Sequence, residues 1–285
     1  MWSSLSPRAR AIAEAVLVTF LWSSSFVLIK IGLRDTLPPV SFAALRYGLA
    51  FACVLVVFLA RGEQHKVRGI TRVDGVRLLI LGLLYYAVTM ATQFIGLSLL
   101  PAISVNLLLS FTTIVVIGLG MLFLSERPTG LQWVGVAIYL GGVAIYYYPF
   151  ALPASEQLGI LVVLIGMLSN AVSSIFGRAL NRAGRLSPLA ITTISMGIGA
   201  AILLGVSLAL YGLPELQPLT WVLIVWMAVV NTAFAFVLWN RSLRVLTAME
   251  SSLLNNLMLA QIPLLAWLFL GEGFSTQAGI GFTIA

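Results

Sequence analysis

Apolar residues run through this chain in long, nearly uninterrupted blocks, separated by short gaps that hold most of the charges and prolines. Each block approaches the ~20 residues that a helix needs to cross about 30 Å of hydrocarbon. The tenth block is too short to cross, so we expect that helix to continue beyond the given sequence. The expected membrane-spanning segments are 11–31, 40–60, 78–99, 102–124, 129–149, 158–179, 189–211, 220–242, 248–270 and a last one from about Ser275.

Composition supports a membrane protein and argues against a nucleic-acid partner. Apolar residues make up 60% of the 285 positions and charged residues only 9%, whereas about 25% is usual in soluble domains. The net charge of +7 comes from basic residues in the gaps between apolar blocks, not from one basic helical face. The first partner we expect is therefore the lipid bilayer.

The distribution of Lys and Arg predicts the orientation in the membrane. A cytoplasmic N-terminus places 13 of the 16 basic residues on the cytoplasmic side, as the positive-inside rule requires. Only Lys30, Arg34 and Arg46 remain near the outer face. We expect Arg46 to pair there with a loop carbonyl or with Asp35. The prediction is a multi-pass protein of a bacterial inner membrane with its N-terminus in the cytoplasm.

An internal repeat divides the chain into two halves, 1–150 and 151–285. Residues 122–126 (LFLSE) reappear at 268–272 (LFLGE), and a glycine follows nine residues after each of these stretches. The offset is 146 residues. Because each half holds five segments, an odd number, the second half must enter the membrane from the opposite side. Glu126 and Glu272 are thus expected on opposite faces. The predicted fold is all-α and integral to the membrane, with ten transmembrane helices in two inverted five-helix repeats.

Polar residues within the apolar blocks are the candidates for a transport pathway, since each must find a partner or line water. They form stripes with helical spacing, and several recur in both halves at matching depth. For any single Ser or Thr, a hydrogen bond between helices, worth about 0.6 kcal/mol, is the competing interpretation. The candidate pathway residues are Trp22, Ser23, Tyr85, Tyr86, Thr89, Gln93, Asn106, Ser110, Asn170, Asn231, Trp239, Ser252 and Asn256.

Two further residues have alternative interpretations that the sequence leaves open. Lys30 lies near the outer end of its helix, where it either extends to the lipid headgroups or attracts a carboxylate at an outer mouth. Pro263 interrupts the hydrogen bonding of the 248–270 helix and acts either as a hinge for gating or as a tolerated bend.

The groups needed for catalysis are not found in the sequence. No Asp or Glu lies at mid-depth, and the single histidine, His65, belongs to a basic loop. There is no metal-ligand spacing, no phosphate-binding glycine loop and no nucleophile with a histidine and an acid, so we expect no enzyme, no metal and no cofactor. A site of amides, hydroxyls and rings suits a neutral, zwitterionic or amphipathic small molecule, without strong proton coupling.

Several stretches resemble EamA-type members of the drug/metabolite transporter superfamily. Residues 22–26 (WSSSF) and 42–47 (FAALRY) resemble the start of such proteins, and 124–126 (LSE) and 263–272 (PLLAWLFLGE) resemble the junctions after the fourth and ninth helices. The resemblance implies ten helices in two inverted repeats and export of amino acids, other metabolites or drugs. Within the superfamily, the chain is most similar to exporters of aromatic and other amino acids.

Together these observations predict a secondary or facilitated transporter that exports amino acids, aromatic and other neutral ones, or related small metabolites by alternating access. A multidrug or quaternary-amine exporter of the same superfamily is the alternative. A membrane-embedded enzyme is the alternative from another class, and it would need clustered acids or histidines at one interface. The sequence leaves the oligomeric state open and is compatible with a monomer.

Overall fold

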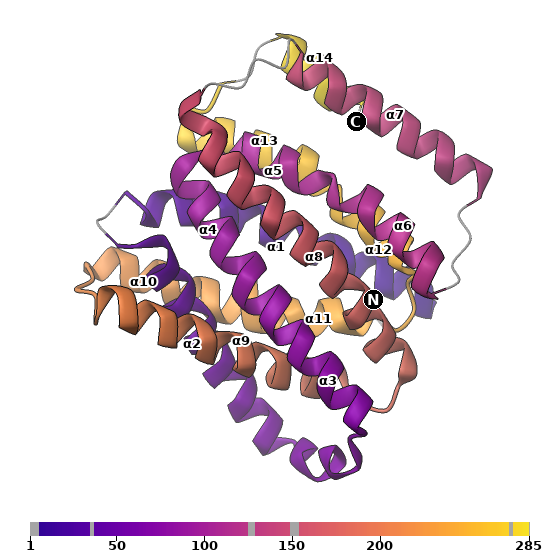
Figure 1. Ribbon diagram of the computed structural model, residues 1–285, viewed down its shortest axis with the longest axis vertical. Coiled ribbons are helices and arrows are strands. Elements are labelled where there is room, and N and C mark those ends of the chain that lie inside the picture. Colours follow the sequence, from indigo (N-terminus) through magenta and orange to yellow (C-terminus); the bar gives the residue numbers. More distant parts are fainter. Residues whose placement is uncertain (1–5, 35–36, 125–128, 149–153, 274–275, 285) are drawn as a thin grey trace.

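Helices form nearly all of the chain in the computed structural model, which describes residues 6–34, 37–124, 129–148, 154–273 and 276–284 (Figure 1). No strand occurs among these residues. The helices are α1 (Pro7–Gly32), α2 (Pro39–Ala60), η1 (Glu63–Gly69), α3 (Arg72–Leu81), η2 (Gly82–Thr89), α4 (Met90–Leu99), α5 (Ala102–Ser110), α6 (Thr112–Leu124), α7 (Gly130–Tyr147), η3 (Ala154–Glu156), α8 (Gln157–Ala183), α9 (Pro188–Tyr211), α10 (Pro218–Trp226), η4 (Met227–Phe234), α11 (Ala235–Ser242), α12 (Ala248–Asn255), α13 (Met258–Leu270) and α14 (Thr276–Ile284).

Eight helical stretches among the described residues are long and apolar enough to cross a membrane, and they correspond to eight of the ten expected segments. The expected segment 129–149 contains a shorter apolar stretch, 133–145 within α7, and the last expected segment corresponds to the short helix α14. The expected total of ten therefore stays a prediction. One boundary differs clearly: the third span begins at Arg72 instead of residue 78, because the Thr71 hydroxyl caps the helix by accepting the Asp74 N–H.

Equivalent helices of the two halves run antiparallel where they contact each other, which is the inverted arrangement that the odd number of segments predicts. In the fourth and ninth spans, α5 contacts α13 and α6 contacts α12. The beginning of the fourth span thus lies beside the end of the ninth span, and the end of the fourth lies beside the beginning of the ninth. In α2 and α9, the Ser41 and Ser207 hydroxyls are hydrogen-bonded at 2.8 Å, and Phe51 packs beside Gly197.

A third equivalent pair, α7 and α14, lies side by side at one margin of the bundle (Figure 1). The Gln277 side chain at the start of α14 donates hydrogen bonds to the carbonyls of Ile145 and Tyr148 at the end of α7, at 2.9 and 2.7 Å. The start of one helix therefore meets the end of the other, so this equivalent pair is antiparallel as well.

Charged residues collect at the two ends of the bundle. At one end Glu14, which is buried, accepts hydrogen bonds from Arg10 and Arg241, and Arg185 binds Asp74 through two hydrogen bonds of 2.9 and 2.7 Å. This is the end that the basic residues predict to be cytoplasmic. At the opposite end Glu272 caps α5 by accepting the backbone N–H groups of Ala102 and Ile103 at 3.1 and 3.3 Å.

Helix irregularities occur in matching pairs. The third and eighth spans each contain a π-helical segment, η2 and η4. The distance along the sequence between the two segments agrees with the 146-residue offset of the repeat to within one residue. The fourth and ninth spans each change helix at the same relative place, between Ser110 and Thr112 and between Asn255 and Met258. There the backbone tightens to hydrogen bonds between residues three apart. Such paired irregularities indicate that both repeats keep the same backbone design.

The backbones of two spans approach each other closely where η2 meets α9. A Cβ atom at Gly199 would lie 2.7 Å from the Gly82 carbonyl oxygen and would also overlap the Tyr86 side chain. We expect Gly199→Ala to destabilise the protein by about 1–3 kcal/mol, because backbone must move to admit the methyl group. Thermal unfolding of the detergent-solubilised chain measures the change.

Gly205→Ala in the same helix is the matched control, since no atom lies within 4 Å of its Cβ position. Its melting temperature should equal or exceed that of the parent. Equal melting temperatures for the two variants would show that η2 and α9 do not approach this closely.

Candidate functional site

A central cavity lies between the two halves and consists of two adjoining lobes of about 710 and 690 Å³. We name them the Arg46 lobe and the Trp239 lobe after one lining residue of each. Five residues line both lobes, two from the first half and three from the second: Trp22, Tyr85, Asn170, Phe236 and Asn255.

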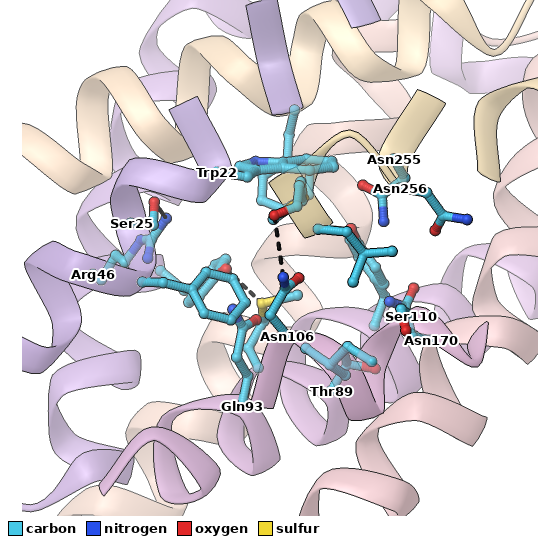
Figure 2. Close-up of a pocket in the computed structure, with 18 residues that line it drawn as sticks. Trp22, Ser25, Arg46, Thr89, Gln93, Asn106, Ser110, Asn170, Asn255 and Asn256 are labelled. Carbon is cyan, nitrogen blue, oxygen red and sulfur yellow. Dashed lines mark hydrogen bonds between the residues drawn. The ribbon is translucent and has the colours of Figure 1, made fainter. Parts of the chain in front are cut away.

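Most of the sequence-predicted pathway residues line this cavity. The Arg46 lobe also contains Thr89, Gln93, Asn106, Ser110 and Asn256 (Figure 2). The Trp239 lobe contains Tyr86, Trp239 and Ser252.

Ser23 and Asn231 line neither lobe and instead join α1 to its neighbours. The Ser23 hydroxyl donates to the Gln261 side chain at 2.8 Å. The Asn231 amide donates to the Leu21 carbonyl and the Ser24 hydroxyl at 2.5 and 2.8 Å. These residues are placed to hold the wall together behind the cavity surface.

Lys30 and Pro263 lie away from the central cavity. The Lys30 ammonium is 3.9 Å from the Glu272 carboxylate, and both side chains line a separate cavity at the end of the bundle opposite Glu14. Pro263 is buried within α13. It lies six residues after Leu257, and Leu257 is the position at which the ninth span changes from α12 to α13. Glu126 and Asp35, which the sequence also singled out, lie outside the described residues.

Aromatic rings form one wall of the cavity. The Trp22 ring centroid lies 5.0 Å from those of both Phe236 and Trp239, and Tyr85 lies 5.5 Å from Phe236 and 5.2 Å from Tyr86. Edge-to-face and tilted pairs of this kind fix the rings relative to one another. The wall therefore presents rigid ring faces and edges to any bound molecule.

The π-helical segments explain how polar groups are presented at this depth. A π turn leaves some carbonyls outside the ordinary helical ladder. In η2 the Leu84 carbonyl accepts hydrogen bonds from the hydroxyls of Thr89 and Ser169, at 2.9 and 2.8 Å. In η4 the Asn231 carbonyl lies 3.5 Å from a guanidinium nitrogen of Arg46. Through these bonds η2 contacts α8 of the second half, and η4 contacts α2 of the first half.

The helix changes in the fourth and ninth spans position amides and hydroxyls. The Asn106 amide donates to the Met258 carbonyl at 3.1 Å, just where α13 begins (Figure 2). The Thr113 hydroxyl donates to the Asn256 side chain at 2.8 Å and accepts from Ser252 at 3.0 Å. These bonds connect the two antiparallel spans across the junction of the halves.

Arg46 corrects the sequence interpretation. We expected it at the outer face, bound to a loop carbonyl or Asp35, but the side chain is 3% exposed and lines the central cavity. Its Nε donates to the Thr232 hydroxyl at 2.7 Å, and its Nη2 donates to Ser25 at 3.1 Å. The long side chain carries the charge away from its own helix towards η4. A basic residue inside an apolar block was the only signal available for this role.

Three buried polar atoms of the wall have no hydrogen-bond partner within the described structure. They are the hydroxyl of Thr112 in the Trp239 lobe, the indole nitrogen of Trp22 and the side-chain carbonyl oxygen of Asn255, and the last two residues line both lobes. A buried unpaired donor or acceptor costs about 1–3 kcal/mol. The free donor of Trp22 and the free acceptor of Asn255, two residues in the wall of the same cavity, suit a ligand that carries both an acceptor and a donor.

The cavity is polar but almost without charge. Arg46 is the one charged side chain among its described lining residues, which include no acid and no histidine. Across the described chain, no three His, Cys, Asp or Glu side chains are grouped to hold a metal ion. The arrangement can bind rings, hydroxyls, amides and one anionic group.

Comparison with known proteins agrees with this architecture. The sequence profile of the EamA-like transporter family matches the chain twice, at residues 9–148 and 157–285. The uncharacterized transporter YyaM of Bacillus subtilis (strain 168) is 26% identical over 77% of this chain and 73% of its own length. The uncharacterized transporter YoaV of the same organism is 24% identical over 93% and 90%.

Two further proteins are similar in sequence or in fold. The uncharacterized inner membrane transporter YedA of Escherichia coli (strain K12) is 27% identical over 62% of this chain and 56% of its own. A protein of known crystal structure superposes with a TM-score of 0.73 over 97% of this chain and 93% of its own. At 18% identity, that similarity shows a shared fold alone.

Cysteine accessibility tests whether the cavity admits water. Cys53 is the single native cysteine, so Cys53→Ser gives a background without thiols. The test variant in this background is Asn170→Cys, at a position that lines both lobes. The control is Ser23→Cys, at a fully buried position in the wall. We expect a small charged thiol reagent to modify position 170 at least about tenfold faster than position 23, because thiol reactivity follows exposure. Equal rates would mean that the lobes are closed to water.

Proposed function

Because the chain belongs to the EamA-like transporter family, we propose that it is a secondary or facilitated transporter that exports amino acids, aromatic and other neutral ones, or related small metabolites. It acts as a multi-pass protein of a bacterial inner membrane with a cytoplasmic N-terminus. The end of the bundle that holds Glu14, Arg10 and Arg241 is then the cytoplasmic end, in keeping with its basic residues.

The observation that carries the proposal is the central cavity between two antiparallel repeats. Transporters built from inverted repeats bind substrate where the repeats meet, and the two repeats can exchange conformations to expose the site on either side. Here both halves contribute lining residues, with Trp22 and Tyr85 from one and Asn170, Phe236 and Asn255 from the other. A relative motion of the halves would change the cavity from both sides at once.

The chemistry of the lining fits an amino acid better than a metal ion or a polyanion. Rings provide a surface for an apolar or aromatic side chain, and amides such as Gln93 and Asn106 provide both donors and acceptors. A metal ion would need carboxylates or thiolates, and a dianion would need several cations. One cation among neutral polar groups suits a zwitterion.

The paired helix irregularities provide the places at which the repeats can bend. The tightened turns of the fourth and ninth spans and the π segment of the third span line the cavity, and the π segment of the eighth span binds Arg46, which lines it. Pro263 removes a backbone donor from the ninth span only, and we propose that it adds a hinge there. Repeats 1–150 and 151–285 then rock about these positions in alternating access.

The outer end of the bundle holds the contacts that such a motion must break. Glu272 joins the ninth span to the start of α5, and Lys30 lies 3.9 Å from the same carboxylate. We propose that Lys30 lies at the outer mouth and that opening of this side separates Glu272 from Ala102 and Ile103.

A multidrug or quaternary-amine exporter is the second candidate, and the aromatic wall favours it. Rings of Trp and Tyr bind cations over their faces, and Trp22, Trp239 and Tyr85 surround one region. The buried charge of Arg46 in the adjoining lobe opposes a cationic substrate. Membership in a transporter family favours transport over the third candidate, a membrane-embedded enzyme.

Transport into or out of liposomes tests the proposal directly. The purified chain should move at least one neutral or aromatic amino acid in a screen of the twenty. Trp22→Ala should lower kcat/KM by at least about tenfold, because the ring packs against two others in the cavity wall. Trp221→Ala, which removes a 45% exposed ring on α10, is the matched control and should transport normally.

No movement of any amino acid would contradict the substrate class, and unchanged transport by well-folded Trp22→Ala would place the pathway elsewhere. Dissipating a pH gradient should leave the rate unchanged, since no described acid or histidine lines the cavity. A rate that depends on the proton gradient would require a different coupling mechanism.

A further inference from the structure

No acidic side chain among the described residues binds the charge of Arg46. The side chain is 3% exposed, eight residues inside its helix counted from Pro38. Its hydrogen-bond partners are the hydroxyls of Ser25 and Thr232 and the Asn231 carbonyl, all neutral groups. Burying a cation without an anion costs several kcal/mol even when neutral groups bind it.

Aromatic rings beside Arg46 reduce this cost without removing it. The guanidinium carbon lies 5.5 Å from the Tyr47 ring centroid and 5.9 Å from that of Phe94. Such cation–π contacts stabilise the guanidinium and offset part of the cost of its burial. They also hold the guanidinium at a fixed place in the wall, so that its planar donors keep one orientation.

The described acids are all engaged or distant from the cavity. Glu14 binds Arg10 and Arg241 at one end of the bundle, and Glu272 caps α5 at the other. None of the described acidic residues lines either lobe. No described acid therefore supplies a counter-ion to Arg46, whereas the cavity that Arg46 lines gives a ligand access to it.

We propose that Arg46, held by Ser25 and Thr232, is the binding site for a carboxylate group of the transported molecule. Carboxylates pair with guanidinium groups through charge-assisted hydrogen bonds, which are stronger than neutral ones, and Nη1 of Arg46 is the guanidinium nitrogen that has no partner among the described residues. The proposal rests on the proposed function and narrows its substrate class to monocarboxylates, including zwitterionic amino acids. It also excludes quaternary amines that carry no anionic group.

The rest of the lobe accommodates the other parts of such a molecule. Phe236 and Trp22 line the same lobe as Arg46 and offer ring surface for an aromatic or apolar side chain. The free side-chain oxygen of Asn255 offers an acceptor for an ammonium group, and the free indole N–H of Trp22 offers a donor. If the ligand has no carboxylate, the buried charge of Arg46 stays unpaired when the ligand binds.

A ligand series on the unaltered protein tests the proposal without any risk of misfolding. Counterflow of labelled phenylalanine in liposomes is measured against four competitors: phenylalanine, 3-phenylpropionate, phenylalaninamide and phenethylamine. The two carboxylates should compete, and the amide and the amine, which lack a carboxylate, should be weaker by at least about tenfold, since a site built for a polar group rejects analogues that lack it.

Variants then assign the effect to Arg46. Arg46→Gln should lose the preference for carboxylates over the amide, and Arg46→Lys should retain part of it, because the charge stays and the fork is lost. Arg61→Gln, at the exposed end of the same helix, removes the same charge and should keep the preference. Thermal shifts of the solubilised full chain with the same four ligands give a readout that does not need transport.

The outcomes separate this proposal from the proposed function. Transport of phenylalanine with equal competition by acid, amide and amine would overturn the carboxylate site and leave transport standing. In a second outcome, no amino acid is transported, but phenylalanine and 3-phenylpropionate raise the melting temperature of the parent and not that of Arg46→Gln. That outcome would overturn the proposed function and support the carboxylate site. Equal preference in Arg46→Gln and in the parent would overturn the assignment to Arg46.

Discussion

In a bilayer every buried polar group must find its partner inside the protein, and the rest of this structure follows from that requirement. The lipid-facing surface satisfies it with apolar helices, so the polar side chains are driven to the places where helices meet. Most of those meetings lie between the two halves. The hydrogen bonds of Asn106 to Met258 and of Arg46 to Thr232 connect groups far apart in sequence, and they concentrate polarity around one cavity.

The two halves share a backbone design but carry different side chains. The π segments and the tightened turns recur in both repeats, whereas Tyr85 and Tyr86 in one π segment are matched by Asn231 and Thr232 in the other. The aromatic pair contributes to the cavity wall, and Thr232 binds Arg46. A symmetric scaffold can therefore change access from either side while the ligand meets a single, asymmetric set of groups. This division explains why the charge lies in one lobe only.

The fold was largely predictable because hydrophobic length and the internal repeat are strong signals. Eight expected spans are helices of sufficient length, and the repeat correctly implied antiparallel equivalents. The third span starts earlier than expected because the cap at Thr71 extends a helix beyond its apolar block. The fifth and tenth segments are shorter apolar helices, so hydrophobic length alone does not establish them as spans.

The candidate site was less predictable, since side-chain direction depends on backbone detail that composition does not reveal. The polar stripes in the sequence predicted most of the lining residues. Ser23 and Asn231 belong to these stripes as well, but their side chains form hydrogen bonds with neighbouring helices and do not line the cavity. Arg46 was assigned to the outer face from its distance along the helix. The π segment that receives its side chain has no sequence signature that we recognised, and the reach of a long side chain changes the depth of its charge.

The opposite polarity of the two repeats is the claim on which the cavity and its access depend. Gly130 and Thr276 are the first residues of α7 and α14, both exposed and 146 positions apart. Single cysteines at these positions, in the Cys53→Ser background, can be labelled in intact cells and in inverted membrane vesicles with a reagent that does not cross the membrane. The account predicts that position 276 is labelled from outside and position 130 only in the vesicles. Labelling of both positions from the same side would contradict it.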